Sequence, residues 1–323
     1  MAAVPLDVDA LTARLAPLDA TNVAPLAGGA SSLTYSANVD GRRVVVKVAP
    51  PGLDPVRNRD VLRQARLLRA LHDTAVVVPE VLWEDAGEPP EIPPLFVMSF
   101  ADGTSLEPLF DVDGQEPESV VAERMRDASR ALATLHAVDP GAIGLGAEPV
   151  VELAAEIDRW CRALETVDPG LAPGWEGVAA GLRRRQPRPV RAAIVHGDFR
   201  LGNLLAVGPT VTAVIDWEIW SVADPRVDLG WFLANADPAT YERRTRYVGR
   251  LPSPDELLSV YAEALGHATA DVDWFRALAC FKSTATWSLI VKHNRRRAEP
   301  DPDVEQMASV LPHLLELAQQ LSA

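Results

Sequence analysis

The chain has 323 residues, 48% of them apolar, and carries a formal net charge of −14 at pH 7. One hydrophobic core rarely keeps growing at this length, so two lobes are expected. The acidic balance argues against a nucleic-acid-binding protein, because phosphate backbones are bound through clustered Lys and Arg. It is compatible with a cationic substrate.

Cysteine usage and hydropathy predict a cytoplasmic protein. The two cysteines, Cys161 and Cys280, are far apart and belong to no Cys/His cluster, so neither a disulfide scaffold nor a structural zinc site is expected. The N-terminal segment lacks a basic region followed by an apolar core, and no run approaches the ~20 apolar residues that a membrane span needs. Neither secretion nor membrane insertion is expected.

The first hundred residues read as a small sheet with one helix. Residues 22–49 have strand character, and Asp40-Gly41 predicts a tight hairpin turn. Lys47 interrupts the β-branched run of the second hairpin strand. Apolar spacing then predicts a helix over 56–72 and strands over 76–83 and 94–100. We assign residues 1–100 to a first lobe and residues 101–323 to a second.

The second lobe is predicted to be mainly helical. Amphipathic patterns favour helices over 118–138, 150–166, 174–185, 255–268 and 272–296. Two short apolar runs around a polar loop, within residues 191–218, interrupt this helical region.

The polar loop carries the strongest chemical signal. It reads His196-Gly197-Asp198-Phe199-Arg200-Leu201-Gly202-Asn203, and Ile215-Asp216-Trp217-Glu218 follows after one hairpin. This spacing is typical of metal-assisted phosphoryl transfer from ATP. Asp198 is expected to orient or accept the proton of the attacking hydroxyl, and Arg200 to approach the transferred phosphate. Asn203 and Asp216 are expected to hold Mg²⁺, which prefers hard oxygen ligands.

With the following Ala-Asp-Pro-Arg-Val-Asp-Leu-Gly (223–230), these motifs resemble the aminoglycoside phosphotransferase family, which includes choline, homoserine and hydroxyacyl kinase relatives. The resemblance extends from Leu26 to about Trp231. It implies an α+β, bilobal protein kinase-like fold with ATP between the lobes. It also implies transfer to a hydroxyl of a small-molecule substrate.

The resemblance also implies roles for residues outside the loop. Lys47 matches the lysine that contacts the α- and β-phosphates, and residues 28–32, with Ser31 and Ser32, match the loop that covers them. The backbones of Ser99 and Ala101 would pair with adenine in a hinge over 98–103. Asp228 resembles a structural acid that braces the catalytic segment.

One position departs from the family pattern. Where a glutamate usually pairs with the strand lysine, this chain has Gln64, and Asp60 lies one helical turn earlier. Gln64 is the expected partner of Lys47, with Asp60 as a substitute. The missing charge keeps open a second class of protein, a nucleotide-binding regulator with weak catalysis.

Several residues have plain structural interpretations. Singly, Asp198, Asn203 and Asp216 could be ordinary turn residues, and only their joint spacing with Lys47 indicates chemistry. His196 is expected to be a structural brace and His136 a helix-end residue that could pack on the catalytic loop. Trp231 is assigned to the core, while Trp217 and Trp220 are left between core and pocket. The arginine runs 183–185 and 295–297 are expected to face solvent, with a smaller case for phosphate binding by the second.

The acceptor stays open between an aminoglycoside and an acyl-CoA-like compound. An acidic acceptor cleft would favour the first, and a basic groove with an apolar tunnel the second. The sequence makes no prediction of oligomeric state.

Overall fold

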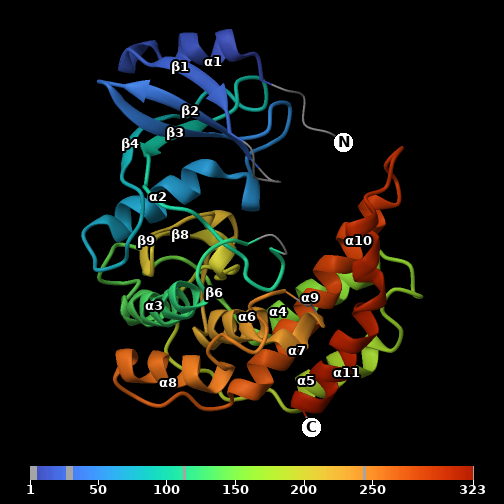
Figure 1. Ribbon diagram of the computed structural model, residues 1–323. Coiled ribbons are helices and arrows are strands. Elements are labelled where there is room, and N and C mark those ends of the chain that lie inside the picture. The colour runs from blue at the N-terminus through green and yellow to red at the C-terminus, as the bar shows by residue number, and fades with distance from the viewer. Residues whose placement is uncertain (1–5, 27–31, 112–113, 243–244, 323) are drawn as a thin grey trace.

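The computed structural model describes residues 6–26, 32–111, 114–242 and 245–322, and these form two lobes (Figure 1). A small lobe built on an antiparallel sheet lies above a larger, mainly helical lobe. The predicted α+β, bilobal kinase-like class is confirmed. No helix in the described ranges is long and apolar enough to cross a membrane.

The small lobe is a five-stranded sheet with helices on both faces. Its strands, in spatial order, are β1 (Thr21–Pro25), β2 (Leu33–Val39), β3 (Arg42–Val48), β5 (Leu95–Ser99) and β4 (Val81–Asp85). All neighbouring pairs are antiparallel. Asp40 and Gly41 take positive φ angles of 49° and 72°, as the predicted β2–β3 hairpin turn requires.

The alternation of side chains along β3 decides where Lys47 points. Val44, Val46 and Val48 pack in one apolar cluster with residues of α1 (Val8–Arg14). Successive residues of a strand face opposite sides of the sheet. Lys47 therefore lies on the other face, which α2 (Val61–His72) covers.

Two predicted boundaries in this lobe were wrong. The helix begins at Val61 rather than residue 56, because Asp60 caps it by accepting a 3.0 Å bond from the Arg63 backbone N–H. The strand predicted over 76–83 begins at Val81. Pro79 has no N–H for a sheet ladder, and the Val77 carbonyl accepts from the backbone of Val214 in the other lobe.

Several helices of the large lobe pack on the long helix α9. The helices of this lobe are α3 (Glu118–Ala137), α4 (Leu153–Leu164), α5 (Trp175–Arg184), α6 (Arg226–Ala236), α7 (Pro238–Tyr241), α8 (Pro254–Leu265), α9 (Val272–Asn294), α10 (Pro302–Gln306) and α11 (Leu311–Leu321). Helices α4, α5, α6 and α11 contact α9, while α3 packs against α8. The helix predicted over 150–166 was wrong at its start, because Val150 and Val151 pair with a strand instead.

Two short sheets bring the sequence motifs together. One contains β6 (Val150–Val151), β10 (Ser221–Ala223) and β7 (Ala193–Val195), and the other is the hairpin of β8 (Leu204–Val207) and β9 (Thr210–Val214). The 196–203 loop connects β7 to β8, and residues 215–220 connect β9 to β10. Each motif therefore connects one of these small sheets to the other, which brings the two motifs close together.

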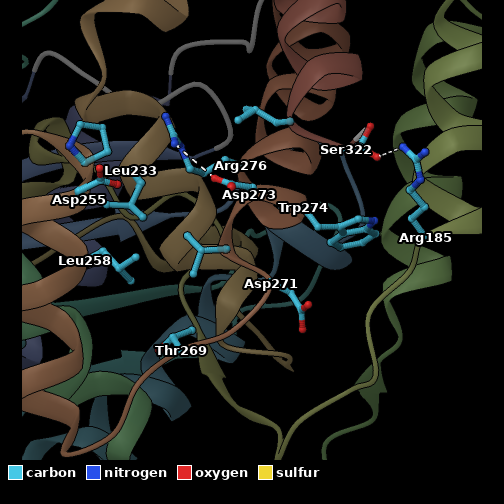
Figure 2. A pocket seen from close by; sticks show the side chains of 13 residues that line it. Arg185, Leu233, Asp255, Leu258, Thr269, Asp271, Asp273, Trp274, Arg276 and Ser322 are labelled. Atoms are coloured by element: carbon cyan, nitrogen blue, oxygen red, sulfur yellow. Dashed lines mark hydrogen bonds and ion pairs between the residues drawn. The ribbon is translucent and has the colours of Figure 1, made fainter.

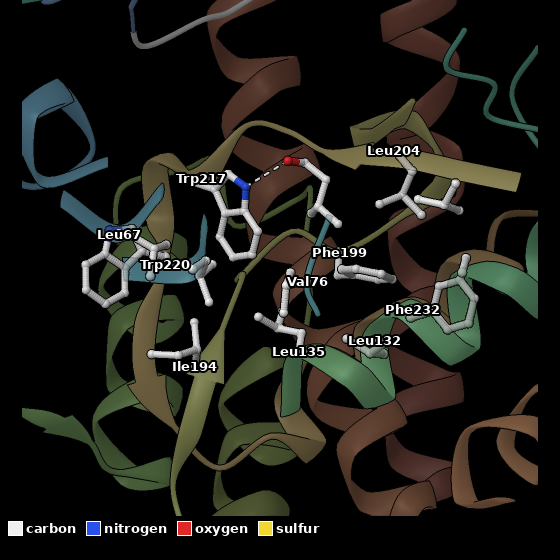
Figure 3. Close-up of a cluster of buried hydrophobic side chains, with 14 of the residues drawn as sticks. Leu67, Val76, Leu132, Leu135, Ile194, Phe199, Leu204, Trp217, Trp220 and Phe232 are labelled. Atoms are coloured by element: carbon white, nitrogen blue, oxygen red, sulfur yellow. Dashed lines mark hydrogen bonds between the residues drawn. The ribbon is translucent and has the colours of Figure 1, made fainter. Parts of the chain in front are cut away.

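One apolar cluster extends through both lobes. It joins Phe96 of β5 to Leu132 of α3 and to Phe199 and Trp217 within the motifs. Part of this cluster is drawn in Figure 3. Gly103 fixes the connecting segment against β8: with φ of 131°, an added Cβ would lie 2.7 Å from the Ala206 nitrogen. The division at residue 100 stays a prediction, since the shared cluster runs across it.

Candidate active site

A cavity of about 420 Å³ lies between the lobes. Its lining comes from β3, α2, the 98–103 segment and both motif segments, and includes Lys47, Gln64, Ser99, Ala101, Asn203 and Asp216. The predicted lysine, hinge and metal positions thus face one space.

Lys47 is paired across the lobes. Its Nζ lies 3.0 Å from Oδ1 of Asp216. The expectation that Gln64 or Asp60 holds Lys47 was therefore wrong. A carboxylate makes a stronger, charge-assisted bond to an ammonium than an amide can, and Asp60 is engaged in capping α2.

Two buried polar side chains near the predicted nucleotide contacts lack a partner within the described part of the chain: Gln64 through Nε2 and Ser32 through Oγ. A buried donor without a partner carries an appreciable free-energy cost. A polar ligand entering the cavity would relieve that cost at Gln64. Ser31 lies outside the described residues.

Asp198 sits at the centre of a set of donors. Its Oδ1 accepts a 2.8 Å bond from the indole Nε1 of Trp231, and its Oδ2 accepts from Asn203 Nδ2 at 2.8 Å and from Arg200 Nε at 3.3 Å. Asn203 Nδ2 also donates to the Asp198 carbonyl at 2.9 Å. These contacts fix the carboxylate in one orientation.

Arg200 is held by a second acid that the sequence analysis missed. Its NH1 lies 2.6 Å from Glu107 Oε2, which also accepts the Gly202 backbone N–H. Burial lowers the pKa of Arg200, but the charges of Asp198 and Glu107 outweigh it and raise that pKa. Burial raises the pKa of Glu107 in spite of Arg200. No local pattern surrounds Glu107, so spacing alone could not have found it.

Asp228 holds the backbone at the start of the 196–203 loop. Asp228 is fully buried and accepts the backbone N–H of His196 at 2.5 Å and of Gly197 at 2.8 Å. Burial opposes its ionisation, but the hydrogen bonds and charges of His136 and His196 dominate and lower its pKa. The bracing role expected of Asp228 is confirmed.

Both histidines are structural as expected. The His196 ring contacts the Ile215 carbonyl at 2.8 Å and the Asp198 backbone N–H at 3.1 Å, so it links the two motifs. His136 ends α3 and reaches Asp228, with Nε2 3.6 Å from Oδ2. It therefore supports the loop through Asp228.

The three tryptophans near the motifs are all buried. Trp217 and Trp220 are both buried in the core, and Trp217 also lines the cavity. Trp231 is buried as predicted, yet its N–H reaches Asp198. The core assignment alone missed this bond.

The arginine runs lie on the surface. Arg183 pairs with Asp158, and Arg295 pairs with Glu305, while Arg296 and Arg297 are exposed. None of them lines the cavity between the lobes.

A second cavity, of about 490 Å³, lies among α8, α9 and α11 (Figure 2). Arg276 NH2 pairs with Asp237 and Arg185 donates to the Ser322 carbonyl, while Arg276 Nε has no partner among the described residues. None of the sequence-predicted site residues lines it.

The fold and the cavity between the lobes define a two-lobed protein of the kinase-like class. Residues 22–277 match the phosphotransferase enzyme family, so the chain belongs to that family.

Curated relatives are longer than this chain. It is 26% identical over 306 residues to acyl-CoA dehydrogenase family member 10 of Mus musculus, covering 90% of this chain and 28% of the relative. It is 26% identical over 285 residues to acyl-CoA dehydrogenase family member 11 of Gallus gallus, covering 82% and 36%. The chain thus spans about a third of the length of these relatives.

Solved structures share the fold. A Ralstonia eutropha protein, named as a candidate aminoglycoside phosphotransferase, matches with a TM-score of 0.77 at 21% identity over 98% of both chains. A choline/ethanolamine kinase family protein from Mesorhizobium loti gives 0.57 at 22%, covering 93% of this chain and 87% of its own. A mutant of aminoglycoside phosphotransferase APH(4)-Ia, in complex with ADP and hygromycin B, gives 0.64 at 15%, covering 95% and 97%.

Proposed function

We propose that this chain transfers the γ-phosphoryl group of ATP, with Mg²⁺, to a hydroxyl of a small molecule. One observation carries the proposal: Lys47 and Asn203 line the same cavity. Lys47 is paired there with Asp216, and Asn203 is bonded to Asp198. Phosphoryl transfer depends chiefly on positioning and charge stabilisation. This arrangement supplies fixed charges of both signs.

The nucleotide would lie in the cavity between the lobes. The Ser99 backbone N–H is already bonded to the Glu80 carbonyl, so adenine would use the Ser99 carbonyl and the Ala101 N–H. Lys47 would contact the α- and β-phosphates, with Ser31 and Ser32 from the covering loop. Structures of the APH(4)-Ia mutants with ADP and with AMP-PNP support nucleotide use in this fold.

The donor set fits Mg²⁺. Asn203 uses its amide nitrogen on Asp198, so its amide oxygen would face the cation, and Asp216 offers a carboxylate beside it. Mg²⁺ binds through few protein oxygens together with phosphate oxygens. Burial, and next the charge of Asp216, raise the pKa of the neighbouring Glu218 to about 7. When bound, the cation would neutralise charge on the phosphates.

Asp198 would orient the acceptor hydroxyl and take its proton as the oxygen attacks. Its carboxylate is held by Trp231, Asn203 and Arg200, which limits reorganisation during the reaction. Arg200 would stabilise the phosphoryl group next to Asp198.

Two classes of acceptor are supported by different observations. The structural neighbours that bind hygromycin B favour a polar, polyhydroxylated acceptor of the aminoglycoside kind. The relatives named as acyl-CoA dehydrogenases favour a hydroxyacyl thioester. Both would present a hydroxyl to Asp198.

A screen of ADP release tests the proposal and separates these acceptors. The enzyme is incubated with ATP, Mg²⁺ and one candidate from aminoglycosides, macrolides, amino alcohols or hydroxyacyl-CoAs. We expect acceptor-dependent ADP release that EDTA abolishes. ATP binding without ADP release from any acceptor would contradict the proposal and favour a nucleotide-binding regulator.

A further inference from the structure

Lys282 is a buried cation in the middle of α9. Its side chain has 6% exposure, and its neighbours Phe281, Ser283 and Thr284 are fully buried. Burial lowers the pKa of Lys282, while the charge of Asp198 opposes that shift. Keeping a lysine in such a place is costly unless its charge is compensated.

The compensation comes from the catalytic segment. Lys282 Nζ donates a hydrogen bond to the backbone carbonyl of Gly197, the residue before Asp198. The same ammonium lies 3.8 Å from the ring centre of Trp231 and 5.7 Å from that of Trp160. Cations are attracted to the faces of indole rings at these distances.

Trp231 links Lys282 to the side-chain carboxylate of Asp198. The indole whose face meets Lys282 donates its N–H to Asp198 Oδ1 at 2.8 Å. A cation above the ring draws electron density from the indole and strengthens its N–H as a donor, since hydrogen bonds in a low-dielectric site polarise one another. Lys282 thus holds both the backbone before Asp198 and one oxygen of its side chain.

We propose that Lys282 is a positioning residue for phosphoryl transfer, which acts through Gly197 and Trp231 to hold Asp198 in its reactive orientation. The proposal rests on the function proposed above. Lys282 itself touches neither nucleotide nor acceptor in this scheme. Its removal should therefore lower kcat and leave the KM for ATP nearly unchanged.

The test compares Lys282→Met with Lys282→Arg and a matched control. Methionine keeps the length and removes the charge, whereas arginine keeps the cation. Lys292→Met is the control, because Lys292 is on the same helix and donates to a backbone carbonyl, that of Thr166, away from the site. If Lys282→Met fails to fold, Lys282→Gln, which retains a donor, takes its place.

Two measurements are made on each variant. Steady-state ADP release gives kcat and the KM for ATP. A proton NMR spectrum records the eight indole N–H resonances, and Trp231→Phe assigns that of Trp231. We expect Lys282→Met to lower kcat about 10- to 100-fold, by analogy with the range seen for outer-shell residues that orient metal ligands. The Trp231 resonance should shift, Lys282→Arg should partly restore kcat, and Lys292→Met should resemble the wild type.

The outcomes separate the two proposals. A wild-type kcat for Lys282→Met, or a Trp231 resonance that moves no more than in Lys292→Met, would overturn the positioning role. Absence of ADP release from the wild type with every acceptor would instead overturn the proposed function, and the NMR comparison would still decide whether Lys282 controls the Trp231–Asp198 bond.

Discussion

The ammonium of Lys47 lies 3.0 Å from a carboxylate oxygen of Asp216, 169 positions further along the chain. This pair joins β3 of the small lobe to the segment that follows β9 of the large lobe. It is also the place where a nucleotide's phosphates and their cation would meet. The relative position of the lobes and the proposed binding of ATP are therefore linked through one contact.

Lys47→Met should weaken ATP binding by about 10- to 100-fold, the equivalent of a lost charge-assisted hydrogen bond. Isothermal titration of ATP with Mg²⁺ measures the change. Lys292→Met serves as the control for loss of one positive charge. An unchanged dissociation constant in Lys47→Met would remove Lys47 from the nucleotide site.

Gln64→Met should have effects of opposite sign on stability and binding. The buried Nε2 lacks a partner within the described residues, so its removal should raise the free energy of unfolding by about 1 kcal/mol. If the amide meets the nucleotide, ATP binding should weaken several-fold at the same time. Urea unfolding and ATP titration test the two effects, and a stability gain without weaker binding would show that Gln64 does not contact ATP.

Glu107→Gln should lower kcat by about 10-fold or more through Arg200, since the 2.6 Å ion pair and the bond to Gly202 orient that guanidinium. The KM for ATP should change little. Glu118→Gln, which loses the exposed pair with Arg250, is the matched control. Equal kcat values in the two variants would contradict a role for Glu107.

Asp228→Asn should destabilise the fold in a pH-dependent way. The pKa of Asp228 is lowered on folding, so its stabilising contribution is fully present above the ordinary value of 3.8 and is lost as pH falls through the folded-state pKa. At pH 7 the variant should lose about 3–5 kcal/mol, typical of breaking a buried charged network. The difference from wild type should persist down to about pH 4 and shrink below it. A difference that grows on acidification would contradict this assignment.

Much of the site was predictable because its parts are close in sequence. Asp198 and Asn203 share one loop, and a short hairpin returns the chain to Asp216, so their spacing indicated their proximity. The partner of Lys47 was not predictable, because Asp216 comes from the other lobe. The family pattern pointed instead to Gln64, which carries no charge. Lys282 left one local signal, because it is the single charged residue among residues 277–291 of the sequence.

In the fold, too, features set by neighbouring residues were predictable and those set by distant contacts were not. The β2–β3 hairpin followed from Asp40-Gly41, because a tight turn depends on two residues. Helix α6 was not predicted: nearly every residue in Arg226–Ala236 is buried, and a helix buried all round has no amphipathic period. The start of α4 was wrong because β6 forms only by pairing with the distant strand β10.

The most direct test of the account is single-turnover phosphoryl transfer by Asp198→Asn, measured with the best acceptor from the screen. Asp158→Asn, which makes the same change at a surface ion pair, is the control. We predict that Asp198→Asn binds ATP with nearly wild-type affinity and transfers phosphate about 100- to 10,000-fold more slowly, the usual contribution of a general base. A wild-type transfer rate in Asp198→Asn would contradict the central claim.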